Sequence, residues 1–205
     1  MGDVVPTSAS DRSSAATGII LCGGLSRRMG RDKAWLPWRG RSLLAHVVDI
    51  LRSLSDDVIM VARPGQSLPG VRARHAEDRI PGAGPLAGLE AGLSATETPY
   101  AIVVACDMPW LNPVLLRAML DIAGDREVVI PYAAGRYHPL HAVYARRLVP
   151  TISELIDRGE RRLHALVERA KVQVVDEPFL HVHDPSGQSL GSVDTLAAYE
   201  AAQGP

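Results

Sequence analysis

The stretch GIILCGG, residues 18–24, decides the fold of this 205-residue chain. Its first five residues form a short apolar run that two glycines end, so it predicts a buried strand. Similar apolar runs occur at 58–61 and 101–105, with helical spacing of apolar residues at 42–54 and a helix of small residues at 84–95 between them. Continuous apolar strands that alternate with helices are typical of a parallel sheet covered on both faces. The sequence therefore predicts an α/β fold of three layers, α/β/α, with a mostly parallel central sheet.

The same patterns predict the remaining elements. Helices are expected at 113–123, within 148–169 and from about residue 194, and strands at 71–75, 127–130, 138–145, 172–175 and 189–193. Residues 1–15 are small, polar and without periodicity, so we expect a disordered tail there. No linker or repeat divides the rest, and residues 16–205 are expected to form a single domain.

Composition excludes several classes of protein. With 46% hydrophobic and 22% charged residues, the chain is neither disordered nor fibrous. A net charge of −1 argues against a nucleic-acid binder, and no apolar run approaches the roughly 18–20 residues that a membrane span needs. Two cysteines without a C-x-x-C motif, and no export signal, predict a cytoplasmic protein. Only two of the 22 basic residues, Lys33 and Lys171, are lysines, which makes a lysine inside a motif informative.

The segment LCGGLSRRMGRDK, residues 21–33, carries the strongest chemical signal. Its glycines follow a buried strand and let backbone N–H groups approach a ligand. Arg27, Arg28, Arg31 and Lys33 then place four cations within seven residues. Backbone donors and clustered cations at the carboxyl end of a strand are what a polyphosphate requires. The segment contains neither the Gly-Lys pair of a P-loop nor a dinucleotide fingerprint. The alternative is a glycine turn followed by a solvated basic loop.

A second glycine-rich segment, DRIPGAGPLAG, spans residues 78–88. It contains a G-x-G-x-x-A pattern, but no strand leads into it, which disfavours a dinucleotide site. Pro85 instead suits the first turn of a helix that begins at Gly84. The free N–H groups of that turn would face a ligand, and Asp78 is near enough to accept from the ligand's amino or hydroxyl groups. A tight turn without a ligand is the alternative.

A third segment places Asp107 after the apolar run that ends at Cys106. Open α/β sheets bind ligands at the carboxyl ends of their strands, and a lone carboxylate there suits Mg²⁺, which keeps most of its shell as water and phosphate oxygens. The alternative is a cap for the helix after Pro109. Cys106 is disfavoured as a nucleophile because no histidine is placed to activate it. The histidine pairs at 138–141 and 181–183 lack a third ligand at a recognisable spacing, which disfavours zinc.

These three segments, in this order, resemble the nucleotidyltransferases that attach a nucleotide to molybdopterin, the molybdenum cofactor guanylyltransferase family. The matching stretches are residues 21–33 with the signature L-x-G-G-x-S-x-R-M-G-x-D-K, 84–88 with a G-P-L-A-G turn, 106–109 with a C-D-x-P metal segment, and the shorter 138–139 and 159–162. The resemblance spans about residues 17–202 and implies a Rossmann-like nucleotidyltransferase domain.

The resemblance implies a Mg²⁺-dependent reaction that joins GTP to the terminal phosphate of molybdopterin and releases pyrophosphate. The residues it implies are Leu21, Cys22, Gly23, Gly24 and Gly84 around the nucleotide, Asp78 on the nucleoside, Lys33 with Arg28 on the phosphates, and Asp107 on the metal. Related cytidylyltransferases carry L-A-A-G at the position of residues 21–24, and the extra glycine here, which makes room for a purine, favours GTP over CTP. Maturation proteins of molybdoenzymes are the implied partners, without nucleic acid or membrane.

Two segments depart from the family pattern. The family often has an asparagine after its second strand, where this chain has Val61 or Ala62. Its N-x-N-T-P segment appears here as SVDTL at 192–196, in which Asp194 is still able to reach a metal or a substrate. Two alternatives stay open: a nucleotidyltransferase of the same fold that uses CTP or a sugar phosphate, and a non-catalytic GTP-binding module of molybdoenzyme maturation, which only the departure at 192–196 supports.

Overall fold

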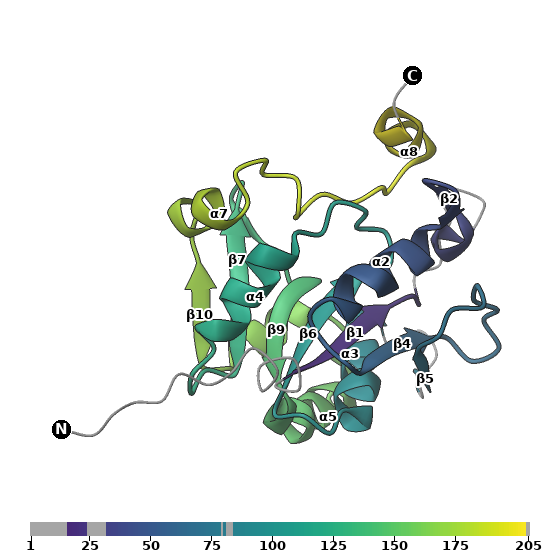
Figure 1. The fold of residues 1–205 in the computed structure, drawn as a ribbon. Helices are drawn as coiled ribbons and strands as arrows, with labels where there is room; N and C mark the ends of the chain where they lie inside the picture. The colour runs from purple at the N-terminus through teal and green to yellow at the C-terminus, as the bar shows by residue number, and fades with distance from the viewer. Residues whose placement is uncertain (1–15, 24–31, 79, 81–83, 204–205) are drawn as a thin grey trace.

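The computed structural model describes residues 16–23, 32–78, 80 and 84–203, and the predicted tail at 1–15 lies outside them. One sheet runs through the molecule in the order β10-β7-β9-β6-β1-β4-β5, with β8 paired to β7 (Figure 1). Its strands are β1 (Ala16–Leu21), β4 (Val58–Ala62), β5 (Arg74–Glu77), β6 (Tyr100–Ala105), β7 (Val128–Ala133), β8 (Arg136–Tyr137), β9 (His141–Ala145) and β10 (Val172–Val175). Along this order, β9 is antiparallel to both of its neighbours, and the other neighbouring pairs are parallel. The predicted α/β class with a mostly parallel sheet is confirmed.

Helices cover both faces of the sheet. Successive residues of each strand point to opposite faces, so a strand that is apolar throughout gives both faces apolar side chains to bury. In β1, Ile20 packs into one apolar cluster and Ile19 into the other. The first cluster is covered by α2 (Leu43–Arg52), α4 (Pro113–Asp121) and α7 (Glu177–His183), and the second by α3 (Gly84–Ala95), α5 (Val149–Asp157) and α6 (Leu163–Val167). Two short 3₁₀ helices, η1 (Lys33–Trp35) and η2 (Arg146–Leu148), complete this arrangement. Within the described part of the chain, no helix has the length and apolarity to cross a bilayer.

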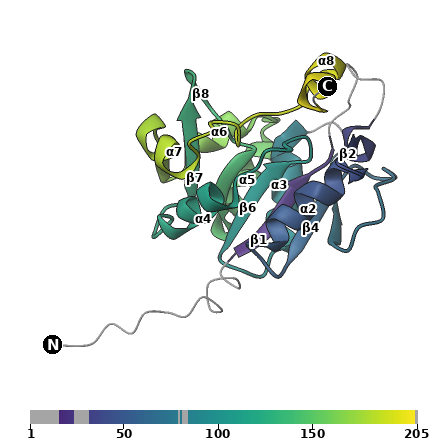
Figure 2. The same cartoon turned by 45° about the horizontal axis from the view of Figure 1, so that its top comes forward.

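A small unit is attached beside the carboxyl ends of the strands. The hairpin of β2 (Pro37–Trp38) and β3 (Arg41–Ser42) lies next to α8 (Leu196–Gln203), as Figure 2 shows. Trp38 is buried there against Trp110, with ring centroids 5.9 Å apart, and against Tyr199 of α8. The Tyr199 hydroxyl also donates to the carbonyl of Pro37. The end of the chain is thereby held close to the segment that follows β1.

The sequence-based expectations differ from the structure in a few elements. The strand expected at 189–193 is wrong, because the backbone of that segment bonds to loops: the Gly191 N–H donates to the Gln188 carbonyl and the Val193 N–H to the Asp107 carbonyl. The helix α7 was not expected: it has seven residues, none of them fully buried, and only Phe179 and Leu180 pack against the core. The strand expected at 138–145 is shorter, and β8 precedes it as half of a hairpin with β7.

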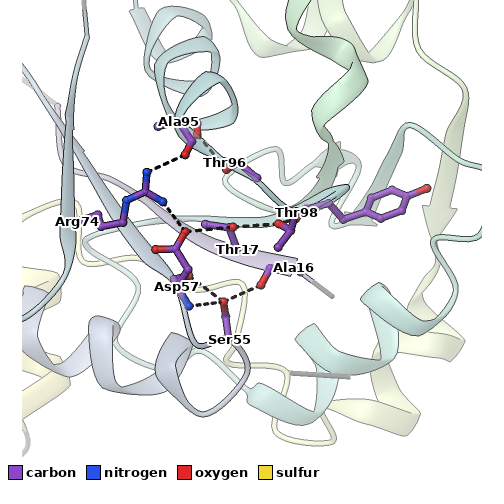
Figure 3. Close-up of polar contacts among 10 residues, drawn as sticks. Ala16, Thr17, Ser55, Asp57, Arg74, Ala95, Thr96 and Thr98 are labelled. Carbon is purple, nitrogen blue, oxygen red and sulfur yellow. Dashed lines mark hydrogen bonds and ion pairs between the residues drawn. The ribbon is translucent and has the colours of Figure 1, made fainter. Parts of the chain in front are cut away.

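A polar network closes the sheet at the amino ends of its central strands (Figure 3). Asp57 accepts a hydrogen bond from Arg74 Nη1 at 2.8 Å, and its backbone N–H donates to Ser55 Oγ. The hydroxyls of Thr17 and Thr98 lie 2.9 Å apart, and Thr17 also contacts the Asp57 carboxylate. These groups satisfy one another, so the network joins β1, β4, β5 and the segment before β6.

Gly92 of α3 sets how closely this helix approaches the sheet. A Cβ atom at Gly92 would lie 2.8 Å from Ile19 Cγ2 and 3.2 Å from Val61 Cγ2. We expect Gly92→Val to lower the free energy of unfolding by about 2 kcal/mol through overpacking, as measured by urea denaturation. Gly70→Val is the control, because a Cβ there has no neighbour within 4 Å. Equal stability of the two variants would contradict this packing.

Candidate functional site

The candidate site lies where β1, β4 and β6 reach their carboxyl ends. Leu21 is in register with Val61 on one side and with Ala105 on the other. The Cys22 N–H donates to the Val61 carbonyl at 2.8 Å, and the Cys106 N–H donates to the Leu21 carbonyl at 3.2 Å. Gly23, Arg63 and Asp107 therefore follow three neighbouring strands at one edge, which is where open α/β sheets bind ligands.

Lys33 makes two ion pairs across this edge. Its Nζ lies 2.6 Å from Asp107 Oδ2 and 2.8 Å from Asp194 Oδ1. The side chains of Lys33 and Asp107 are only 15% and 13% exposed, whereas that of Asp194 is 61% exposed. The structure thus brings together the predicted Lys33 and Asp107, which are 74 positions apart, and adds Asp194 to them.

The surroundings shift the pKa values of these groups in different directions. Burial alone would lower the pKa of Lys33, but the hydrogen bonds to the two carboxylates outweigh burial and raise it. Burial raises the pKa of Asp107, and the Lys33 ammonium offsets only part of that rise. The hydrogen bond from Lys33 lowers the pKa of the more exposed Asp194. The short ion pairs are those of one ammonium with two carboxylates, which together carry a net charge of −1.

The backbone of Lys33 is fixed by its neighbours. Asp32 caps η1 and accepts a hydrogen bond from the Ala34 N–H at 3.0 Å, and Ala34 is fully buried. Gln66 Nε2 donates to Asp32 Oδ2 at 2.7 Å and to the Cys22 carbonyl at 3.1 Å. Gln66 thus ties the residues on the two sides of segment 24–31 together, and no sequence motif pointed to it. Gly24 and Arg28 of that segment lie outside the described residues.

Asp194 reaches the site because its loop is anchored on Asp107. The Val193 N–H donates to the Asp107 carbonyl at 2.9 Å, and the Val193 side chain is fully buried. Ser192 Oγ donates to Asp194 Oδ2 at 2.8 Å. The segment that departs from the family pattern therefore places a carboxylate at the position where it meets Lys33.

A buried polar cluster holds the chain that leads to Asp194. Ser189 Oγ accepts from the Asn112 N–H at 2.8 Å and lies 2.7 Å from His141 Nε2. Asp184 accepts from the Ser189 N–H at 2.9 Å and from Asn112 Nδ2 at 3.2 Å. Burial alone would raise the pKa of Asp184, but these hydrogen bonds and one from Ser186 lower it. The cluster fixes segment 184–189 against the start of α4 and the start of β9.

His141 makes the stability of the protein sensitive to acid. It is fully buried, its Nδ1 has no hydrogen-bond partner among the described residues, and burial lowers its pKa to about 4. The unfolded chain takes up the proton near pH 6.5 but the folded protein does not. We expect the free energy of unfolding to fall by about 3 kcal/mol between pH 6.5 and pH 4 through this group.

The measurement is urea denaturation across that pH range. His141→Leu is the comparison, because this variant lacks only His141 and keeps all other titrating groups. The variant is expected to lose less stability on acidification than the unchanged protein. Parallel curves for the two proteins would show that His141 does not carry the effect.

The second glycine-rich segment lies on the other side of β1. The Asp78 N–H donates to the Ala62 carbonyl at 2.9 Å, and Asp78 Oδ1 accepts from the Ile80 N–H. Gly84 begins α3 with a φ of +75°, and a Cβ there would lie 3.0 Å from the Arg161 carbonyl. Gly84 and Arg161 of the GERR segment at 159–162 are therefore close together at the start of α3. Residues 81–83 of the predicted turn lie outside the described residues.

The structure also describes the surroundings of the other residues that the sequence analysis considered. Val61 and Ala62 are buried and apolar, so neither replaces the family's asparagine with a polar side chain. Cys106 is buried, and a hydrogen bond with Cys22 together with burial raises its pKa well above the usual range, which agrees with its rejection as a nucleophile. Among the residues with a described position, no group of three or more His, Cys, Asp or Glu side chains is arranged to hold a metal.

Arg63 is a site residue that the motifs did not single out. It directly follows β4, and a Cβ on Gly23 would lie 3.5 Å from its Cγ. Its backbone N–H donates to Gln66 Oε1 at 3.1 Å, while its Nε is buried without a hydrogen-bond partner in the described part of the chain. Its position directly after β4 was the one signal for it in the sequence.

Known proteins resemble this chain in sequence. A family model described as the MobA-like NTP transferase domain matches residues 18–174. A probable molybdenum cofactor guanylyltransferase of Mycobacterium avium is 42% identical over 191 residues, which cover 90% of this chain and 93% of that protein. The protein of the same description from Mycobacterium tuberculosis is 39% identical over 181 residues, covering 83% and 90%.

Solved structures share the fold. Molybdopterin-guanine dinucleotide biosynthesis protein A from Archaeoglobus fulgidus superposes with a TM-score of 0.78 at 23% identity, over 91% of this chain and 96% of that chain. A 2-C-methyl-D-erythritol 4-phosphate cytidylyltransferase from Thermus thermophilus gives a TM-score of 0.66 at 16% identity, over 90% and 96%. Both proteins therefore have the architecture seen here.

Proposed function

This chain belongs to the MobA-like NTP transferase family and is a nucleotidyltransferase, and on that basis we propose that it transfers GMP from GTP to the terminal phosphate of molybdopterin. The products are the guanine dinucleotide form of the cofactor and pyrophosphate. The observation that carries this proposal is the Lys33 ammonium between Asp107 and Asp194, at the carboxyl ends of β1 and β6. A cation and two carboxylates at this end of the sheet support a site for a triphosphate and its metal ion.

The donor set fits Mg²⁺. This ion prefers oxygen ligands, is usually bound through one or two carboxylates, and keeps water and phosphate oxygens in its remaining positions. Asp107 and Asp194 each offer a carboxylate, and the partly exposed Asp194 leaves room for water and phosphate. We infer that these two residues hold the ion, which when bound offsets negative charge on the triphosphate.

The chain's own residues act by position and charge. A terminal phosphate oxygen of molybdopterin attacks the α-phosphorus of GTP, the bond from that phosphorus to the bridging oxygen breaks, and pyrophosphate leaves with the bonding electrons. The attacking phosphate is already ionised at neutral pH, so no general base is required, which agrees with the buried position of His141. Lys33 offsets the charge of the phosphates, as expected for phosphoryl-type transfer by positioning and electrostatics.

Two features support GTP over CTP. Gly23 leaves space beside Arg63, which a side chain at this position would occupy. Arginine pairs well with the O6 and N7 acceptors of guanine.

The two cysteines are buried and form no disulfide, which agrees with a reducing compartment. We infer that the reaction takes place in the cytoplasm, where molybdoenzyme-maturation proteins would receive the product.

The test combines purified protein, Mg²⁺, molybdopterin and each nucleoside triphosphate in turn, with the product identified by mass. We expect a guanine dinucleotide and an equal amount of pyrophosphate with GTP only. A cytosine dinucleotide would identify a cytidylyltransferase. Binding of GTP without pyrophosphate release would identify a binding module and would overturn the proposal.

A further inference from the structure

Lys33 occupies the place between the two carboxylates where a cation would bind. Its Nζ is within hydrogen-bond distance of one oxygen of Asp107 and one oxygen of Asp194. These two oxygens converge on a single positive charge, as they would on a metal ion. The other Asp194 oxygen accepts from Ser192, so the carboxylate is oriented toward Lys33.

An ammonium and a divalent ion cannot share this position. Mg²⁺ binds carboxylate oxygens at about 2.1 Å, so an ion bound to the same two oxygens would lie within contact distance of Nζ. Both are positively charged, and the surroundings are largely buried on the side of Asp107. A metal therefore binds the pair only after Nζ has moved away.

The side chain of Lys33 can move without the backbone. The backbone of η1 is fixed on both sides of Lys33, because Asp32 accepts the capping hydrogen bond from the Ala34 N–H and Ala34 is buried. A lysine is a compact charge on a flexible four-carbon stem, whereas an arginine would grip a carboxylate with a planar fork. In a chain that uses arginine for nearly all of its other basic residues, a lysine at this point suits a charge that must change partners.

We propose that Lys33 is a stand-in for the metal: it occupies the Asp107–Asp194 pair in the free protein and gives the pair up when a nucleoside triphosphate draws it to the phosphates. This inference rests on the proposed function for the identity of the ligand. Removal of the ammonium leaves two carboxylates with a charge of −2, which a divalent ion neutralises. Nucleotide and metal therefore bind cooperatively, and the free protein binds the metal weakly.

The test measures Mn²⁺ binding without nucleotide, from the EPR signal of the free ion. Lys33→Met keeps most of the side-chain volume but removes the charge, and we expect it to bind Mn²⁺ at least about tenfold more tightly than the unchanged protein. Lys171→Met is the matched control, because Lys171 is the other lysine and pairs with the exposed Asp125. It is expected to bind Mn²⁺ as the unchanged protein does.

The added affinity must depend on the carboxylates, so Lys33→Met combined with Asp107→Asn is expected to lose it. No gain in Lys33→Met, an equal gain in Lys171→Met, or a gain that survives Asp107→Asn would each overturn the proposal. Lys33→Gln serves in place of Lys33→Met if thermal unfolding shows that the latter does not fold. The readout is metal binding, so it is independent of whether the unchanged protein forms a guanine dinucleotide.

Discussion

Asp107→Asn is expected to lower the turnover number by about 10²–10³-fold while the protein folds normally. The change removes the more buried of the two carboxylates that we assign to the metal, and with it the charge that holds the ion beside the phosphates. Lys33 keeps its ion pair with Asp194, so the loop at 192–196 retains a partner. The measurement is pyrophosphate release at saturating GTP and Mg²⁺.

Asp121→Asn is the control for this variant. Asp121 ends α4 and is exposed, so the same change of charge occurs away from the site. Its turnover should equal that of the unchanged protein. Full activity in Asp107→Asn would mean that another group holds the metal.

Lys33→Met is expected to lower turnover by a similar factor, about 10²–10³-fold, although it binds the metal more tightly. The two effects have opposite signs because the ammonium competes with the metal in the free protein but neutralises the phosphates in the complex. Pyrophosphate release and Mn²⁺ binding measured on the same preparation separate them. Lys171→Met should change neither.

Lys33→Arg distinguishes charge from geometry. It retains a positive charge, but its planar fork would bind both carboxylates more firmly than an ammonium does. We expect turnover to remain well below that of the unchanged protein. Recovery of full turnover in Lys33→Arg would contradict the requirement for a cation that changes partners.

The core of the fold follows from apolar patterns in the sequence. The runs at 18–22 and 101–105 predict the neighbouring strands β1 and β6, because a strand buried on both faces has no polar positions. Their register places Cys22 and Cys106 at neighbouring strand ends. The basic segment and Asp107 were expected to share one ligand, and Lys33 does lie beside Asp107. The start of α3 at Gly84 was likewise predicted from Pro85.

The rest depends on contacts between distant residues. A strand was predicted at 189–193, but the N–H groups of Gly191 and Val193 bond to loops rather than to a neighbouring strand. The pairing of His141 with Ser189 joins positions 48 residues apart, and neither lies in a motif. Asp194 was noted as a departure, but its contact with Lys33 depends on the anchoring of Val193 to Asp107. No local pattern encodes such contacts.

The polar groups at the two ends of the strands differ, which explains why only the carboxyl ends form a candidate site. At the amino ends, Asp57 is paired with Arg74, and Thr17 with Thr98, in a network that joins strands (Figure 3). At the carboxyl ends, two carboxylates share a single ammonium and Arg63 Nε has no partner within the described residues. Within the described residues, two carboxylates that share one ammonium and a buried donor without a partner at the same end of the sheet indicate a site that a ligand completes.

The most direct test is a crystal structure of the protein with Mn²⁺ and a GTP analogue that cannot be cleaved between its α- and β-phosphates. We expect anomalous scattering from Mn²⁺ at Asp107 and Asp194, with Lys33 Nζ moved onto a phosphate oxygen and the base next to Gly23. Mn²⁺ bound away from Asp107, or Lys33 still between the two carboxylates with the nucleotide in place, would contradict it.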